Sequence, residues 1–156
     1  MTSQATAVRV PPAWVHFLRA HASITRALNT DLLGSHRLTL SDYEVLLRLA
    51  HAPDRRLRRV DLAEGVLLTA SGVTRLLDGL ERAGLVEKAT CASDARVTYA
   101  CLTEGGEEKL KQASRSHVAE VRALFAQAYS DEELETLARL LARLGDGSAN
   151  AAECTA

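Results

Sequence analysis

Residues 69–103 limit the fold of this chain more than any other stretch, because a short helical pattern is followed at once by a hairpin pattern. The helical part carries apolar residues three and four positions apart: Val73, Leu76, Leu77 and Leu80. The Thr69 hydroxyl can cap the N-terminus of this helix. Gly84 stands where a left-handed C-terminal cap belongs. The sequence therefore predicts a short helix with a marked beginning and end.

A second helical pattern lies just before it, over residues 57–68. The polar gap between the two patterns is very short, as a helix-turn-helix requires. In that motif the second helix lies in the DNA major groove with its N-terminal residues at the base edges. An Arg there can form two hydrogen bonds to guanine, worth roughly 1–3 kcal/mol of discrimination. We therefore predict DNA contacts from Thr69, Ser71, Thr74 and Arg75.

The hairpin pattern consists of residues 86–91 and 96–102, which are rich in Val, Thr, Tyr and Cys and flank a small polar tip. Such a hairpin beside a helix-turn-helix forms a wing. Arg96 stands at the base of the tip, and an Arg can insert into the negative potential of a narrow minor groove. Asp94 can accept a hydrogen bond from Arg96 and hold its side chain outward. We predict that both residues contribute to DNA binding.

Plainer interpretations of these residues remain open. The polar face of the helix can be the solvated side of an ordinary core helix, and the helix alone favours that interpretation. Asp94 and Arg96 can form an exposed ion pair worth at most about 1 kcal/mol. The hairpin directly after the helix shifts the balance toward a winged helix-turn-helix.

The charge distribution agrees with a DNA-binding segment, although the net charge of the whole chain is only −1. Residues 55–96 hold eight Lys and Arg against six acidic residues, whereas the rest of the chain is net acidic. A local basic excess is the electrostatic footprint of nucleic-acid binding. We include Arg58, in this basic segment, among the predicted DNA contacts.

The chain resembles the MarR family (multiple-antibiotic-resistance regulators) in the order and spacing of its motifs. The matching segments are LTLSDYEVLLRL (38–49), DLAEGVLLTASGVTRLLDGLERAGLVEK (61–88), SDAR (93–96) and CLTEGG (101–106). The resemblance extends over roughly residues 13–145. It departs from the family at Ala95, where the wing usually has Arg, and at Gly79, where many members have Arg. Both departures remove possible phosphate contacts.

The resemblance implies a dimeric transcriptional regulator. Helices from both chain ends would form the dimer interface, and each winged lobe would bind half of a palindromic operator. Many such proteins are repressors that are released by small, often aromatic anions or by oxidation of a Cys. The alternative is a winged-helix protein-interaction module without specific DNA readout, which the low net charge, Gly79 and Ala95 support.

The remaining sequence predicts four more helices. Two lie over residues 13–34 and 42–50, the latter opened by a capping box of Ser41 and Glu44. A long helix follows over residues 103–128, and a Leu-rich last helix begins at a second capping box of Ser130 and Glu133. The fold class is therefore mainly α with a small β-hairpin wing.

These elements suggest a division of labour along the chain. We expect a flexible arm over residues 1–12, dimerisation helices over residues 13–36 and 104–145, a winged helix-turn-helix lobe over residues 37–103, and a disordered tail over residues 146–156. The apolar stripe with Trp14, Phe17 and Leu18 has no obvious partner in so small a lobe. A homodimer would bury it; the alternative is that the two chain ends pack against each other.

The sequence contains no arrangement that predicts an enzyme, a cofactor or a metal site. The five His residues lack metal-ligand spacing. In the expected hairpin Cys91 faces roughly Arg96 and Cys101 faces roughly Val86, so the two thiols are about 16 Å apart, too far for a disulfide. A reactive single thiol at Cys91 is the alternative to a strand-packing role.

No run approaches the roughly 20 apolar residues of a membrane helix, and the N-terminus has no apolar signal core. The expected location is the cytoplasm, without a membrane partner.

An effector pocket is implied by the resemblance, between the dimer helices and the DNA lobe. Trp14, His21 and Tyr43 would line it, because an aromatic wall with polar groups suits a small aromatic acid. Ordinary core and interface packing is the alternative for each of these residues.

Overall fold

The computed structural model describes residues 11–65, 70–90 and 97–144, and it confirms a mainly helical chain with a small antiparallel sheet. The elements in chain order are α1 (Pro12–His36), α2 (Leu40–His51), the 3₁₀ turn η1 (Pro53–Arg55), β1 (Arg56–Arg58), α3 (Arg59–Gly65), α4 (Ala70–Arg82), β2 (Val86–Thr90), β3 (Thr98–Leu102), α5 (Glu104–Ala128) and α6 (Asp131–Ala142). The chain divides into two compact units, Met1–His117 and Val118–Ala156. Helix α5 crosses the boundary between them.

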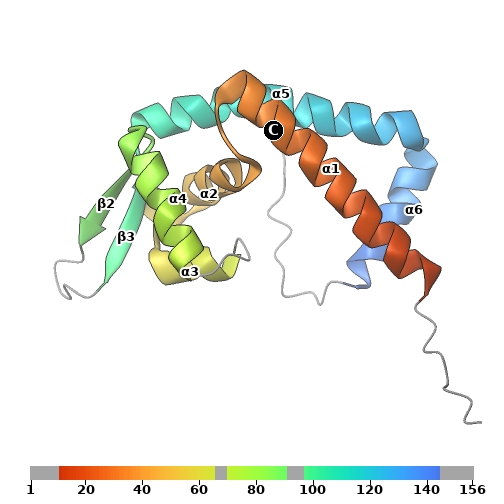
Figure 1. Ribbon diagram of the computed structural model, residues 1–156, viewed down its shortest axis with the longest axis horizontal. Coiled ribbons are helices and arrows are strands. Elements are labelled where there is room, and N and C mark those ends of the chain that lie inside the picture. The colour runs from red at the N-terminus through yellow and green to blue at the C-terminus, as the bar shows by residue number, and fades with distance from the viewer. Residues whose placement is uncertain (1–10, 66–69, 91–96, 145–156) are drawn as a thin grey trace, which may run out of the picture. The chain divides into compact units, whose positions relative to one another are not determined.

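The core of the first unit lies where α2, α3 and α4 meet the sheet (Figure 1). Its largest fully buried side chains come from the four helices α1 to α4: Leu32, Val45, Leu46, Leu49, Leu62 and Leu77. Burial of a Leu side chain stabilises the fold by roughly 1.5–3 kcal/mol. This aliphatic core fixes α4 and the sheet as one body.

Helix α4 forms as its sequence pattern predicts. Val73, Leu77 and Leu80 of its apolar stripe are buried, and Leu76 packs against them while partly exposed. At the C-terminus Gly84 adopts a positive φ of 71°. The Leu85 and Gly84 amides then donate to the carbonyls of Leu80 and Glu81, both at 2.9 Å. This Schellman motif ends the helix and directs the chain into β2.

The sheet has three strands in the order β1-β3-β2. The prediction of a helix over residues 57–68 is wrong at its beginning, because Leu57 and Arg58 belong to β1 and α3 begins at Arg59. Leu57 lies opposite Ala100 and packs against the core, so strand pairing takes these two residues out of the helix. The expected hairpin register is off by one residue, since Cys101 lies opposite Glu87.

The capping box of α2 also differs from the prediction. Helix α2 begins at Leu40, and its cap is formed by Thr39 and Asp42 rather than by Ser41 and Glu44. The Asp42 carboxylate accepts from the Thr39 amide at 2.8 Å, and the Thr39 hydroxyl accepts from the Asp42 amide at 3.1 Å. Leu38, just before this cap, lies in the core and is 3% exposed.

The wing joins α5 through a close backbone contact. The Thr103 hydroxyl accepts from the Gly106 amide at 3.0 Å and donates to the Gly84 carbonyl at 2.7 Å. A Cβ at Gly106 would overlap the backbone of Leu85, so glycine is required here. The first turn of α5 is thus fixed to the turn between α4 and β2.

In the second unit, α6 begins at the predicted capping box of Ser130 and Glu133, which the structure confirms. Several large apolar side chains of the chain ends are exposed: Trp14, Phe17 and Leu18 on α1, and Leu140, Leu141 and Leu144 at the other end. No helix in the described residues combines the length and hydropathy needed to cross a membrane.

Candidate nucleic-acid interface

Helix α4 has one face in the core and one face available to a partner. Val73 and Leu77 are buried, whereas Ser71 and Arg75 are exposed and Thr74 is half-buried. The predicted recognition residues therefore lie on the outer side of α4, at its N-terminal end. Within the described part of the chain, the Arg75 guanidinium has no hydrogen-bond or ion-pair partner. Its five N–H donors can bind an external acceptor without breaking such a bond.

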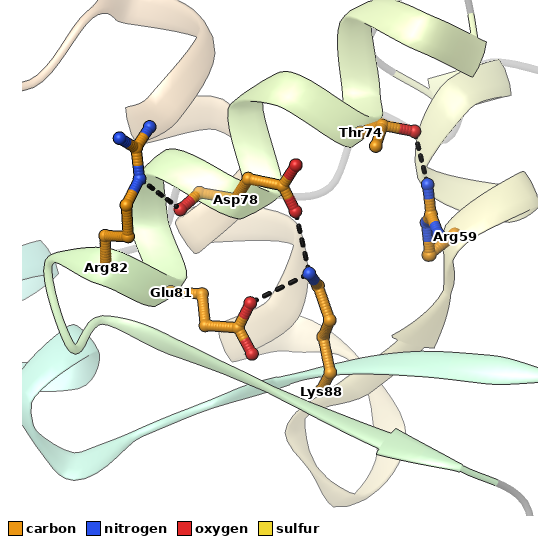
Figure 2. Close-up of polar contacts among 6 residues, drawn as sticks. All are labelled: Arg59, Thr74, Asp78, Glu81, Arg82 and Lys88. Carbon is orange, nitrogen blue, oxygen red and sulfur yellow. Dashed lines mark hydrogen bonds and ion pairs between the residues drawn. The ribbon is translucent and has the colours of Figure 1, made fainter.

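Thr74 is held by a residue that the sequence prediction missed. The Arg59 guanidinium, at the N-terminus of α3, donates to the Thr74 hydroxyl oxygen (Figure 2). Arg59 is half-buried and lies on the same side of the lobe as the outer face of α4. The contact joins the two helices of the helix-turn-helix close to the predicted DNA contacts. Only the gathering of Arg residues between positions 55 and 59 hinted at such a role.

Arg58, the predicted contact before the motif, has a partner within the chain. Its Nε and Nη2 donate to the two carboxylate oxygens of Asp61, both at 2.8 Å. This bond lowers the pKa of the Asp61 carboxyl and raises the pKa of Arg58. The pair is exposed, and exposed pairs contribute little to folding. DNA contact by Arg58 remains a prediction, and it would begin from an ion-paired state.

The wing is anchored to α4 through Lys88 of β2. Its ammonium group lies 2.7 Å from an Asp78 carboxylate oxygen and 2.8 Å from a Glu81 carboxylate oxygen (Figure 2). On the same helix, the Arg82 Nε donates to the Asp78 carbonyl at 3.1 Å. Hydrogen bonding to Lys88 lowers the pKa of the Asp78 carboxyl. Two carboxylates in the C-terminal half of α4 are thereby balanced by a cation from the wing.

Three of the predicted DNA contacts, Thr69, Asp94 and Arg96, lie outside the described residues. The same holds for Cys91. Their DNA contacts, and the reactive thiol at Cys91, remain predictions.

The predicted effector residues fall into two places. On α1 the Trp14 ring stacks on Phe17 at 6.3 Å between centroids, and Phe17 stacks on His21 at 6.4 Å. Tyr43 is instead buried between α2 and α5, where its hydroxyl lies 3.1 Å from the Ser114 hydroxyl. In the described residues, no ring contact or hydrogen bond joins Tyr43 to Trp14 or His21.

His117 packs on Tyr43, with 4.5 Å between the ring centroids. Its Nδ1 is buried and has no hydrogen-bond partner among the described residues. Burial lowers the pKa of His117, against the opposing charge of Asp31. The sequence pattern alone predicted no role for His117.

A helix with an exposed polar face, a preceding helix across it and a hairpin after it define a winged helix-turn-helix protein. Comparison with known proteins gives the family. Residues 37–97 match the sequence profile of the MarR family. The HTH-type transcriptional regulator MhqR of Bacillus subtilis is 31% identical over 127 residues, which cover 81% of this chain and 85% of that protein.

Solved structures agree with this match. AbsC, a MarR family transcriptional regulator from Streptomyces coelicolor, is 32% identical, with a TM-score of 0.77 over 92% of this chain and 95% of that chain. Sco3205, a MarR family regulator from the same organism in complex with DNA, is 27% identical, with a TM-score of 0.79 over 89% of this chain and 90% of that chain. The chain belongs to the MarR family of transcriptional regulators.

Proposed function

We propose that this chain acts as a homodimer that binds a palindromic DNA operator through α4 and the wing, and that it represses the genes behind that operator. The observation that carries the proposal is Arg75. It is exposed on the outer face of a helix whose other face is buried, and it has no partner among the described residues. A DNA target would place the working protein in the cytoplasm.

In this account, the N-terminal half of α4 enters the major groove. Arg75 would bind a guanine through two hydrogen bonds, which gives roughly 1–3 kcal/mol of base discrimination. Ser71 and Thr74 would contact bases or phosphates, as would Thr69, while Arg58, Asp94 and Arg96 would contact the backbone or minor groove beside it. Phosphate contacts would set the position of the lobe on the duplex, and Arg75 would select the sequence.

The exposed apolar residues of the chain ends support the homodimer. Trp14 is 52% exposed, Leu18 45% and Leu144 78%, and patches of this kind mark interaction surfaces. A two-fold dimer would present two copies of α4 to one duplex. Half-sites one helical turn apart, about 34–36 Å, then require a matching separation of the two helices.

A small aromatic or anionic ligand would release the DNA by binding better to a dimer whose helices are wrongly spaced. Trp14 and His21 on α1, and Tyr43 beside α5, are the residues we propose for this ligand. The two groups of residues could line one pocket or belong to separate contacts, and titration of variants at each group would distinguish these cases.

The proposal is tested by selection of duplexes from a random-sequence DNA pool with the full-length chain, followed by sequencing. We expect enrichment of one inverted repeat whose half-sites lie about 10 base pairs apart, or a multiple of that spacing. Binding at low salt that is independent of sequence would contradict the proposal. Capture of a stoichiometric protein partner by such a chain would support the protein-interaction module instead.

A further inference from the structure

The geometry of the contact between Lys88 and α4 bears on the orientation of the wing relative to this helix. Asp78 and Glu81 are three residues apart, so they lie on one face of α4. Lys88 reaches both carboxylates from β2, at 2.7 and 2.8 Å (Figure 2). These are contacts between two elements joined by a short turn. They close a loop between the recognition helix and the wing strand.

The position of the contact along each element lets it restrain the orientation of the hairpin relative to α4. Asp78 is one helical turn beyond Arg75 on α4. Lys88 is the middle residue of β2, where it lies opposite Ala100 of β3. Ala100 is fully buried, so this part of the hairpin is fixed in the core. The strand then continues to Thr90, toward the tip. Any rotation of the hairpin about its base would break the contact.

Lys88 is poorly placed to serve as a phosphate contact itself. Two of the three donors of its ammonium group are taken by carboxylates. Its side chain is 35% exposed, compared with 46% for Asp78 and 41% for Glu81. Hydrogen bonds to Asp78 and Glu81 stabilise the protonated form of Lys88 and raise its pKa. A phosphate would have to compete with both carboxylates for the same cation.

We propose that Lys88 is a positioning residue, which ties β2 to Asp78 and Glu81 of α4 and so sets the angle between the wing and the recognition helix. This inference rests on the proposed function and deepens it. With the angle fixed, the wing and α4 meet one duplex in a single arrangement. Without it, the hairpin would sample orientations that fit a matched sequence no better than an unrelated one.

The rival interpretation is that Lys88 contacts phosphate and that Asp78 and Glu81 merely weaken DNA binding by their charge. The two interpretations predict opposite results when the carboxylates are removed. If charge alone matters, D78N/E81Q binds all DNA more tightly and leaves sequence discrimination unchanged or improved. If the contact aims the wing, the same variant loses discrimination, although its overall affinity for DNA does not fall.

The experiment measures dissociation constants of the full-length chain for two duplexes of equal length and composition. One is the duplex selected from the random pool, and the other is its scrambled version. The readout is the dissociation constant for the scrambled duplex divided by that for the selected duplex, because a change in net charge affects both duplexes alike. The variants are K88M, D78N/E81Q, the triple combination and K88R. K111M is the matched control, since Lys111 forms an ion pair with Glu107 within α5.

We expect K88M and D78N/E81Q each to lower the ratio about fivefold, which lies within the range for residues coupled in one network. The triple variant should be no worse than either, since the same contact is already broken. K88R, which can still reach both carboxylates, and K111M should retain the wild-type ratio. Thermal unfolding of each variant distinguishes loss of the wing orientation from loss of the fold.

Additive losses in the triple variant would overturn the proposal, as would an unchanged ratio in D78N/E81Q. A wild-type chain that does not distinguish the two duplexes would overturn the proposed function itself, and this inference with it. A wild-type chain that distinguishes them, beside variants that do so equally well, would overturn the positioning role alone.

Discussion

The winged lobe and the chain ends use similar apolar stripes in different ways. In the lobe, Leu46 and Leu77 are fully buried by other elements of the same chain. Trp14 on α1 and Leu144 just after α6 remain 52% and 78% exposed. The core of the lobe is therefore completed within one chain, with Leu32 of α1 and Leu110 of α5 contributing to it, whereas the ends leave apolar side chains exposed. Under the proposed function, the surface that contacts DNA would form within one chain, and its duplication would depend on a second copy.

The largest expected effect is a cavity in the lobe. Leu77→Ala removes most of a side chain that is 1% exposed, and such losses in a core cost about 2–5 kcal/mol. Urea unfolding followed by circular dichroism measures the change in the free energy of unfolding. The cost should be the same at all protein concentrations, because the cavity lies inside one chain. A loss below about 1 kcal/mol would mean that the lobe core is not continuous.

A charge on the exposed stripe of α1 should act on assembly instead. Leu18→Glu is expected to weaken dimerisation at least about tenfold, because the interface would bury an unpaired carboxylate. Sedimentation equilibrium measures the dimer dissociation constant. Ala20→Glu adds the same charge on another side of the same helix and should have little effect. If both variants dimerise like the wild type, α1 is not the interface.

A smaller effect concerns the cap of α2. Thr39→Ala removes the hydroxyl that accepts from the Asp42 amide, and loss of such a cap costs about 1 kcal/mol. Ser41→Ala is the matched control, since Ser41 lies inside the helix and the capping box belongs to Thr39. Its free energy of unfolding should stay within about 0.5 kcal/mol of the wild type. Equal losses for the two variants would contradict the assigned helix start.

The smallest expected effect is a pH dependence from His117. Burial lowers its pKa below the ordinary value of 6.5, so the unfolded chain binds a proton before the folded chain does. Stability is therefore complete above pH 6.5 and declines as the pH falls through 6.5 toward the lower folded-state pKa. His117→Gln should reduce the pH dependence of the melting temperature between about pH 7.5 and 5.5, a range set by histidine titration. An unaltered slope in that variant would exclude His117 as its source.

The existence of the helices and the C-terminal end of α4 could be predicted because they depend on local patterns. The stripe from Val73 to Leu80 and the cap at Gly84 need no knowledge of distant residues. Strand β1 could not be predicted in this way, since Leu57 becomes a strand residue only by pairing with Ala100. The cap of α2 was ambiguous, because Thr39 with Asp42 and Ser41 with Glu44 have the same spacing.

In the candidate site too, local patterns could be predicted, whereas contacts between different elements could not. Ser71 and Arg75 were predicted from their spacing on one helix, and the structure places both on its exposed face. The contacts of Arg59 with Thr74 and of Lys88 with Asp78 join residues 15 and 10 positions apart, on different elements. Such contacts follow from how the elements pack, which a single sequence does not reveal.

The central claim is that the exposed end of α4 reads DNA through Arg75. Its most direct test is the affinity of Arg75→Ala for the duplex selected by the wild-type chain, measured beside Arg139→Ala, which removes an equal charge from α6. We expect Arg75→Ala to bind this duplex about tenfold more weakly, as the loss of one guanine contact implies, and Arg139→Ala to bind it normally. Wild-type affinity in the Arg75→Ala protein would contradict the account.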